Sequence, residues 1–168
     1  MTSPEDAPTV ESVTDQEARL VLPRADRASL YALGRRMADT ALERALPILI
    51  QIRFGARLVF VASLPGSTAS NDGWAERKSR VAARFEQSSL LVRLVNERDN
   101  TSIHVHHSLP AEEYAAHGGA FPLRVAGTGV VGSVVVSGLP QLQDHAFVVE
   151  MLAAHLAEQT ERTPGVQA

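Results

Sequence analysis

The sequence predicts an α+β fold in which helices flank an antiparallel sheet. Two segments, ILIQIRFGARLVFVAS and FPLRVAGTGVVGSVVVSG, each contain two β-rich runs around a glycine turn, as hairpins do. Three other segments repeat apolar residues at helical spacing. Hairpin-connected strands are antiparallel neighbours, and no linker interrupts the pattern. One helix-covered sheet is therefore expected.

The chain of 168 residues is expected to contain a single domain over residues 25–158. Residues 1–22 are rich in Pro, Glu, Asp, Ser and Thr without an apolar period, so they predict a mobile N-terminal arm. Residues 159–168 end in TPGVQA and predict a mobile C-terminal tail.

The first two elements are a helix and a hairpin. The helix is expected from Arg27 to Arg44, with Asp26 as its N-cap and Pro47 as its stop. The hairpin that follows turns at Gly55.

The loop LPGSTASNDG separates this hairpin from a second helical region, expected over residues 72–96 with a break near Ser88 and Ser89. A short helix is expected over residues 111–116. The second hairpin turns at Gly127, and a last helix runs over residues 140–158, where proline suits the first turn.

The composition excludes several classes of site. Without cysteine, the chain cannot form a disulfide, a thiolate zinc site, an iron–sulfur cluster or a cysteine nucleophile. A net charge of −3 gives no general attraction to nucleic acid or acidic membranes. No apolar run approaches the roughly 18 residues of a membrane span, and the N-terminus lacks a signal-peptide pattern. We expect a cytoplasmic protein that binds neither nucleic acid nor membrane.

Five segments resemble a known family: LPGSTASNDGWAERK, RFEQSS, YAAHGGAFPLRV, GTGVVGSVVVSGLPQ and DHAFVVEML. Their order and spacing resemble the UPF0303 family of the haem-degrading-domain superfamily. The resemblance implies a profilin-like or PAS-like domain of two or three layers, a homo-oligomer, and haem as a candidate cofactor. It carries over these site positions: Asn71, Trp74, Arg77, Lys78, His117, Gly118, Gly119, Asp144 and His145.

The first candidate site is a helix face. On a helix, Trp74, Lys78, Val81 and Phe85 share one side. A lysine in this apolar stripe, with Arg77 beside it, suggests an anion site for a carboxylate, a phosphate or a haem propionate. Alternatively, Lys78 extends past Trp74 to solvent and the arginines pair with surface acids.

The stretch HGGAFP allows two interpretations of His117. In the first, His117 contacts a ligand while Gly118 and Gly119 let a planar molecule approach the backbone. In the second, the glycines supply positive φ at a helix C-cap, where a histidine is favoured by the helix dipole. The glycines alone explain a corner in the chain, but they do not explain the histidine.

Asp144 and His145 fall in the first turn of the last helix. The helix dipole favours an aspartate there and disfavours a histidine. The pair fits a general base or a ligand contact, and it equally fits a buried network that joins the helix to the sheet.

Two other histidine patterns are weaker. On a strand, His104 and His106 of IHVHH would share one face, as metal-chelating histidines can, but no carboxylates complete a ligand set. No metal site is therefore expected. His155 is expected in the core or in an interface.

We predict a small-molecule binding protein whose ligand is haem or another planar or anionic molecule. Two alternatives stay open. One is an enzyme acting on a small anionic substrate, with Asp144 or His145 as base and Lys78 or Arg77 holding the anion. The other is an oligomeric assembly or adaptor protein without catalysis. The binding hypothesis predicts that His117 lies near Trp74 or Lys78 and lines a pocket with them.

Overall fold

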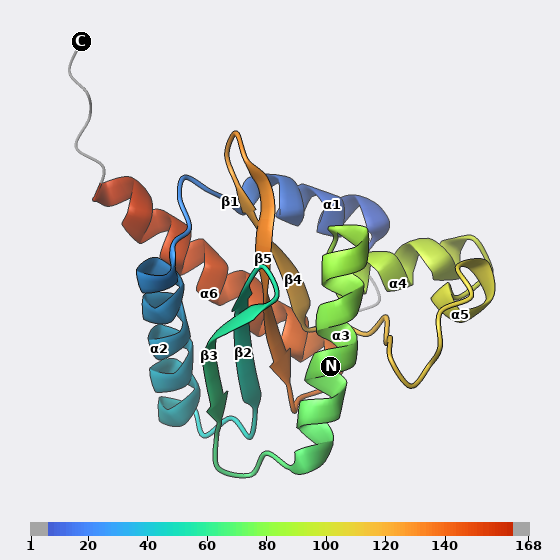
Figure 1. The fold of residues 1–168 in the computed structure, drawn as a ribbon, viewed down its shortest axis with the longest axis horizontal. Helices are drawn as coiled ribbons and strands as arrows, with labels where there is room; N and C mark the ends of the chain where they lie inside the picture. Colours follow the sequence, from blue (N-terminus) through green and yellow to red (C-terminus); the bar gives the residue numbers. More distant parts are fainter. Residues whose placement is uncertain (1–6, 163–168) are drawn as a thin grey trace.

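A five-stranded sheet lies between helices in the computed structural model, which describes residues 7–162 (Figure 1). The strand order is β1-β4-β5-β2-β3. The strands are β1 (Val21–Leu22), β2 (Leu49–Phe54), β3 (Arg57–Ser63), β4 (Ala120–Val125) and β5 (Gly129–Ser137).

The pairing of the strands confirms both predicted hairpins. β2 pairs with β3 around Gly55, and β4 pairs with β5 around Gly127, in each case antiparallel. An antiparallel β2–β5 pair joins the two hairpins, with Ile50 opposite Val136. The short β1 pairs in parallel with β4, so the sheet is antiparallel except at this one edge.

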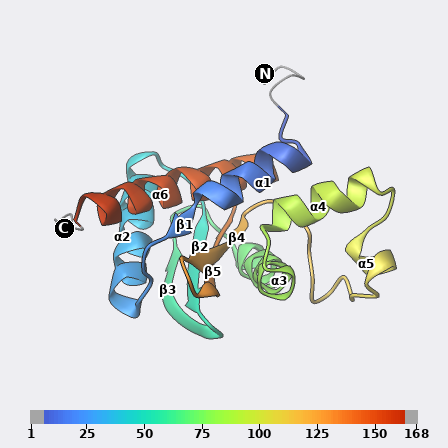
Figure 2. The ribbon, with the colours of Figure 1, turned by 90° about the horizontal axis from the view of Figure 1, so that it is seen from above.

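The helices form the outer layers of a three-layer domain (Figure 2). They are α1 (Val10–Arg19), α2 (Arg27–Glu43), α3 (Ala69–Phe85), α4 (Ser89–Arg98), α5 (Ile103–His106) and α6 (Gln141–Glu161). α2 and α6 cover one face of the sheet, while α3 covers the other. The predicted α+β class is confirmed.

Alternation along the central strands explains the two faces. Ile50 and Ile52 of β2 belong to the large core beneath α2 and α6. Leu49 faces the other way and packs with Ala75 and Ala82 of α3. Because successive side chains of a strand point to opposite faces, one apolar run can serve two helix layers. Small alanines allow α3 to lie close to the sheet.

The predicted N-terminal arm is wrong for the described residues, because residues 10–22 form α1 and β1. Thr9 caps α1 by accepting a hydrogen bond from the Ser12 backbone N–H at 3.1 Å. Val13 is fully buried against α4, and Leu22 is buried in β1. α1 has few apolar residues, so its sequence shows no apolar repeat at helical spacing. Residues 1–6 of the predicted arm lie outside the described range.

The predicted boundaries of other elements change by a few residues. α6 continues to Glu161, so residues 159–161 are helical, and residues 163–168 of the predicted tail lie outside the description. α3 begins at Ala69 because Thr68 is its N-cap, with a capping box to Asn71. The predicted break between helices is present, with Glu86 at a φ of +52°.

Between α4 and β4, the predicted short helix is wrong, and the strand considered for IHVHH is a helical turn instead. Residues 111–113 form a turn and residues 114–116 have no regular secondary structure, so no helix is present there. Residues 103–106 form the short α5, which Ser102 caps through its bond to the Val105 N–H at 3.3 Å. The capping serine outweighs the β-branched Ile103 and Val105, so the histidines of IHVHH do not lie on a strand.

Candidate functional site

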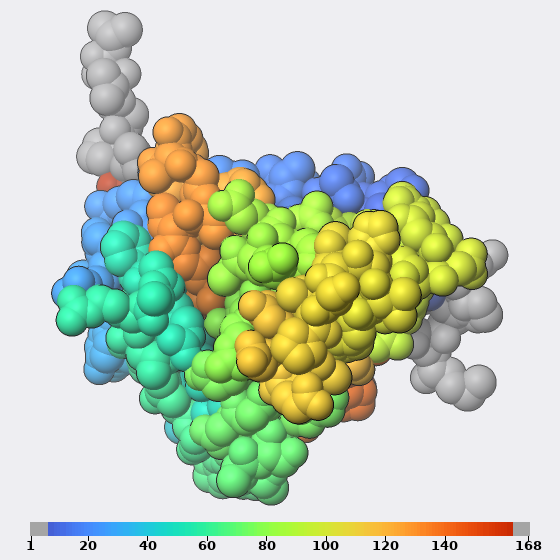
Figure 3. Space-filling view, turned by 45° about the vertical axis from the view of Figure 1, so that its right-hand side comes forward, coloured from blue at the N-terminus to red at the C-terminus, as the bar shows by residue number. Residues whose placement is uncertain are grey.

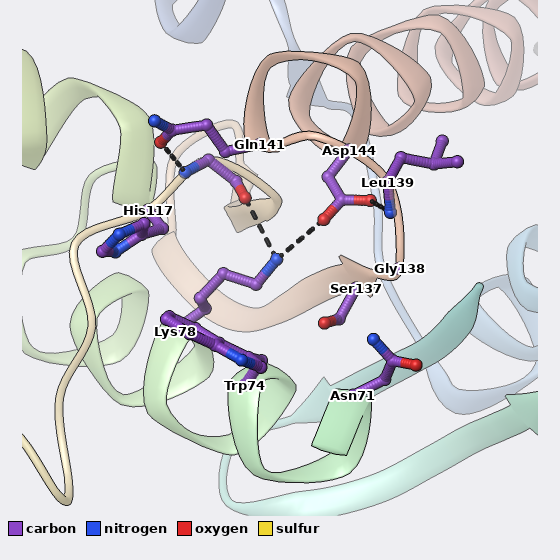
Figure 4. A pocket seen from close by; sticks show the side chains of 10 residues that line it. Asn71, Trp74, Lys78, His117, Ser137, Gly138, Leu139, Gln141 and Asp144 are labelled. Atoms are coloured by element: carbon purple, nitrogen blue, oxygen red, sulfur yellow. Dashed lines mark hydrogen bonds and ion pairs between the residues drawn. The ribbon is translucent and has the colours of Figure 1, made fainter. Parts of the chain in front are cut away.

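A cavity of about 230 Å³ opens between α3, the chain before β4, and the β5–α6 connection (Figure 4). We call it the Trp74–His117 pocket. Its lining includes six of the predicted site residues and four others: Asn71, Trp74, Lys78, His117, Gly118, Ser137, Gly138, Leu139, Gln141 and Asp144.

A buried ion pair forms the floor of this pocket. Lys78 and Asp144 are only 3% and 2% exposed. Lys78 Nζ donates to Asp144 Oδ2 at 3.1 Å and to the carbonyl oxygens of Gly118 and Val136 at 3.0 and 2.7 Å. An ammonium group has three N–H donors, and all three are used. Lys78 therefore neither extends to solvent nor keeps a donor free for an anion.

Burial and attraction act against each other in this ion pair. Burial lowers the pKa of Lys78 and raises the pKa of Asp144, while the opposite charge of each partner counters the shift in the other. Asp144 Oδ1 also accepts the Leu139 backbone N–H at 3.0 Å. The pair thus joins α3 to the start of α6 and to the end of β5.

The two glycines after His117 are explained by this packing. At Gly119, φ is +127°, and a Cβ atom would lie 2.5 Å from Lys78 Nζ and against the Val136 carbonyl oxygen. At Gly118, a Cβ atom would meet the Gln141 carbonyl oxygen. Gly118 has no positive φ, and no helix precedes it. The glycines therefore admit the chain's own atoms. The helix C-cap interpretation is wrong, because no helix precedes them.

His117 lies against Trp74, as the binding hypothesis required. Their ring centroids are 5.1 Å apart with an interplanar angle of 65°, an edge-to-face contact. The Arg77 guanidinium also lies over the indole, 4.1 Å from its ring centroid. Trp74 thus contacts both an imidazole and a cation, and its ring is part of the pocket wall (Figure 4).

The surroundings of the His117 imidazole favour its neutral form. Burial lowers its pKa, and the positive charges of Arg93, Lys78 and Arg77 lower it further. Its Nδ1 is buried and has no hydrogen-bond partner among residues 7–162. His117 is itself one of the residues that line the pocket. A neutral imidazole can bind a metal or accept a hydrogen bond.

Three of the predicted site residues do not line the pocket. Arg77 lies outside it, on Trp74, and Gly119 lies behind the ion pair. His145 points to α1, where its Nε2 donates to Gln16 Oε1 at 2.9 Å. Burial lowers the pKa of His145 to about 4. Asp144 and His145 are adjacent in sequence but make different buried contacts. Asp144 joins α6 to α3, and His145 joins α6 to α1.

Sequence reasoning missed four lining residues on one connection. Ser137, Gly138, Leu139 and Gln141 surround Pro140 between β5 and α6. Gln141 Oε1 accepts the Gly118 N–H at 3.0 Å and so ties this connection to the corner after His117. The segment SGLPQ is part of one of the five segments that resemble the UPF0303 family. It lies between a predicted strand and a predicted helix start, which was the available sign that these residues could line a site.

The histidines of the IHVHH pattern lie on α5, and one of them bonds to the backbone. His104 Nδ1 donates to the Leu109 carbonyl oxygen at 2.8 Å. No group of three or more potential metal ligands occurs within residues 7–162. Within the same range, no helix is long and apolar enough to cross a membrane.

Comparison with known families decides the relationship. The sequence model described as "Haem degrading protein HbpS-like" matches residues 26–153. The chain belongs to this family. A UPF0303 protein of Streptomyces avermitilis is 45% identical over 152 residues, which are 90% of this chain and 93% of the relative. A UPF0303 protein of Burkholderia thailandensis is also 45% identical, over 90% of this chain and 92% of the length of that relative. The resemblance to UPF0303 is confirmed.

Solved structures share the fold of this HbpS-like chain. The Ybr137w protein has a TM-score of 0.82 at 26% identity, covering 92% of this chain and 91% of its own. A PduOC–haem complex has a TM-score of 0.66 at 17% identity, and the match covers 77% of this chain and 94% of the PduOC chain. The HbpS structure has a TM-score of 0.61 at 16% identity, covering 79% and 90%. At such low identities, the last two establish the fold alone.

Proposed function

We propose that this protein binds haem at the Trp74–His117 pocket, with His117 as the iron ligand. The observation that carries the proposal is the His117 ring, which packs on Trp74 and lines the pocket, and whose pKa is lowered by burial. We assign Nε2 as the nitrogen that would bind the iron. Membership of the HbpS-like family supports haem as the ligand class.

The chemistry of the pocket fits the iron side of haem. Histidine is a common axial ligand of haem iron, and this chain has no cysteine to take that place. Lys78 and Asp144 neutralise each other, so the floor adds no net charge. The cavity of about 230 Å³ is below the range of about 300–1,000 Å³ for sites that enclose a drug-sized ligand. One chain therefore encloses only part of haem.

Each residue at the pocket has its own role in the proposed haem binding. His117 supplies the nitrogen ligand, and Trp74 supplies an apolar ring surface. Arg77, already held on Trp74, supplies positive charge near the pocket for a propionate. When bound, haem would supply a redox-active iron. Asn71 Oδ1 accepts the Thr68 N–H at 2.7 Å, which fixes the amide at the start of α3 beside the pocket.

The enzyme alternative has less support at this site. The candidate anion-holding Lys78 has no free N–H, and the candidate base Asp144 is bonded through both oxygens. His145 lies outside the pocket with its Nε2 bonded to α1. General base catalysis by either residue would require these buried contacts to break first.

A haem titration followed by absorbance tests the proposal. We expect the wild-type chain to give a saturable Soret band at one equivalent. His117→Ala should weaken haem binding at least about tenfold, because it removes the iron ligand. Trp74→Leu should weaken it less. His106→Ala, on the exposed α5, is the matched control and should bind as the wild type does.

The same titration can contradict the proposal. His117 takes no part in the Lys78–Asp144 network, so His117→Ala should keep a wild-type circular dichroism spectrum. If a folded His117→Ala protein binds haem as tightly as the wild type, His117 is not the ligand and the proposal is wrong.

A further inference from the structure

We propose that a second cavity, between α2 and α6, binds the phosphate group of a small molecule. It lies near the C-terminal end of α6, whereas the Trp74–His117 pocket lies at the start of that helix. α6 has 21 residues and is therefore about 30 Å long. We call it the α2–α6 cleft. Its volume is about 340 Å³, and three arginines are in its wall: Arg24, Arg36 and Arg162.

Two of these arginines have no hydrogen-bond or ion-pair partner for the guanidinium group among the described residues. Arg36 forms an ion pair with Glu158, and Asp26 accepts the Ser29 N–H as the cap of α2. Arg24 and Arg162 form no side-chain hydrogen bond or ion pair with any part of the chain from residue 7 to 162. They come from the segment before α2 and from the end of α6. Two separate elements thus bring unpaired positive charge to one cavity.

A buried histidine completes the set of donors. His155 is only 4% exposed and lines the same cavity. Its Nε2 lies 3.0 Å from Gln159 Nε2. An amide nitrogen can only donate, so His155 Nε2 accepts and the ring proton is on Nδ1. This Nδ1–H group is buried and has no acceptor within the described range. Burying a donor without an acceptor is costly, and an oxyanion in the cleft would supply the acceptor.

The electrostatics agree with this arrangement. Burial lowers the pKa of His155, the charges of Arg36 and Arg24 lower it further, and Glu158 raises it. The imidazole of α6 therefore lies within the field of two arginines from the α2 side of the cleft. An anion bound among them would stabilise the Nδ1–H group and offset the charge of Arg24 and Arg162.

A phosphate group fits these donors better than a carboxylate. Two guanidinium forks and one imidazole N–H offer more donors than the two oxygens of a carboxylate can use, whereas a phosphate monoester has three terminal oxygens and a second charge. The cleft is also larger than a phosphate ion, and its volume lies within the range of small-molecule pockets, about 300–1,000 Å³. We therefore infer a phosphorylated small molecule rather than free phosphate.

The test uses the full chain with ¹⁵N-labelled histidine and glycerol 3-phosphate as the probe. We expect a saturable shift of the His155 ring nitrogens, with weaker binding of inorganic phosphate and of sulfate at equal ionic strength. Arg24→Ala and Arg162→Ala should each weaken binding about tenfold or more, because each removes a charge-assisted hydrogen-bonding group. Arg24→Lys should recover only part of the loss. Arg84→Ala, an exposed arginine of α3, is the matched control.

Three results would overturn the proposal. One is an unchanged His155 spectrum at saturating probe. Another is equal affinity of the wild-type, Arg24→Ala and Arg162→Ala proteins. The third is an equal loss in Arg84→Ala, which would indicate attraction by net charge alone. Because Arg24 and Arg162 are exposed and form no side-chain hydrogen bond or ion pair within residues 7–162, we expect their alanine variants to fold with a wild-type thermal midpoint.

Discussion

At Gly119 the backbone conformation and the surrounding atoms both require glycine. The residue has a φ of +127°, and a Cβ atom would lie 2.5 Å from Lys78 Nζ. Gly127 also has a positive φ, of +73°, but nothing lies within 4 Å of a Cβ atom there. These two glycines separate the cost of backbone strain from the cost of crowding.

We predict that Gly119→Ala destabilises the protein more than Gly127→Ala does. Both variants place alanine at positive φ, which costs about 1–3 kcal/mol. Only Gly119→Ala also displaces the Lys78 ammonium group from its buried acceptors, so it should lower the free energy of unfolding by at least about 2 kcal/mol more. Urea unfolding measures the difference. Equal losses would mean that Lys78 can shift without cost.

His145 gives a second prediction at this scale, about the effect of pH. Burial lowers its pKa from 6.5 to about 4 in the folded state. Between these values the unfolded chain binds the proton first, so the free energy of unfolding falls as pH falls from 6.5 to 4. The loss from this one residue is up to about 3 kcal/mol. We expect His145→Gln, which keeps a polar partner for Gln16, to show a flatter pH dependence.

Urea unfolding at pH 7 and at pH 4.5 measures this difference. His117 and His155 also have lowered pKa values, so the comparison with His145→Gln isolates the effect of His145. His106→Ala is the control. An identical pH dependence in the wild type and in His145→Gln would show that this ring protonates without unfolding.

At the scale of elements, the Lys78–Asp144 ion pair connects α3 to α6 across the end of the sheet. We predict that Lys78→Met lowers the free energy of unfolding by about 3–5 kcal/mol, because it leaves the Asp144 carboxylate buried without its cation. The double variant Lys78→Met with Asp144→Leu should lose less than the sum of the two single variants. Urea unfolding of the four proteins measures this coupling. Additive losses would contradict a direct interaction.

Elements with strong local signals were predictable from the sequence. α2 has an apolar stripe with Asp26 as its N-cap, and both hairpins have glycine turns between β-rich runs. α1 was not predictable in this way. It is held by tertiary contacts, including the buried Glu17, which accepts the Ser88 backbone N–H at 2.6 Å. A buried carboxylate in a polar segment gives no periodic signal, because its stabilising partner lies 71 residues away.

Part of the candidate site was also predictable, and for a physical reason. Lys78 on an apolar helix face and His117 at a glycine corner were not explained by local structure, and both line the Trp74–His117 pocket. The partners of Lys78 could not be read from the sequence. They are two backbone carbonyl groups and one carboxylate on three segments, and only the folded chain brings them together.

At the scale of the whole molecule, the sheet has an open edge at β3. Among the described residues, β3 pairs only with β2, and its Leu58 and Val61 are 51% and 47% exposed. In Figure 3 this hairpin lies at the surface on the left, in turquoise. An exposed apolar edge strand favours pairing with another chain, so we expect a homo-oligomer.

Light scattering coupled to size exclusion tests this expectation. The mass at micromolar concentration should be a multiple of the 18.1 kDa chain. Val61→Lys should shift it toward the single chain, whereas Val105→Lys on α5 should not. A wild-type mass of one chain would contradict the expectation of an oligomer.

The central claim is that His117 is the residue that contacts the ligand, and histidine ring spectra with haem test it most directly. The chain has six histidines, and ¹⁵N labelling resolves their ring nitrogens separately. At one equivalent of ferric haem, we predict that the His117 ring signals disappear first, because its Nε2 binds the paramagnetic iron, while those of His104 on α5 remain. If the His117 signals persist at saturation, or if another histidine loses its signals instead, the account of this pocket is wrong.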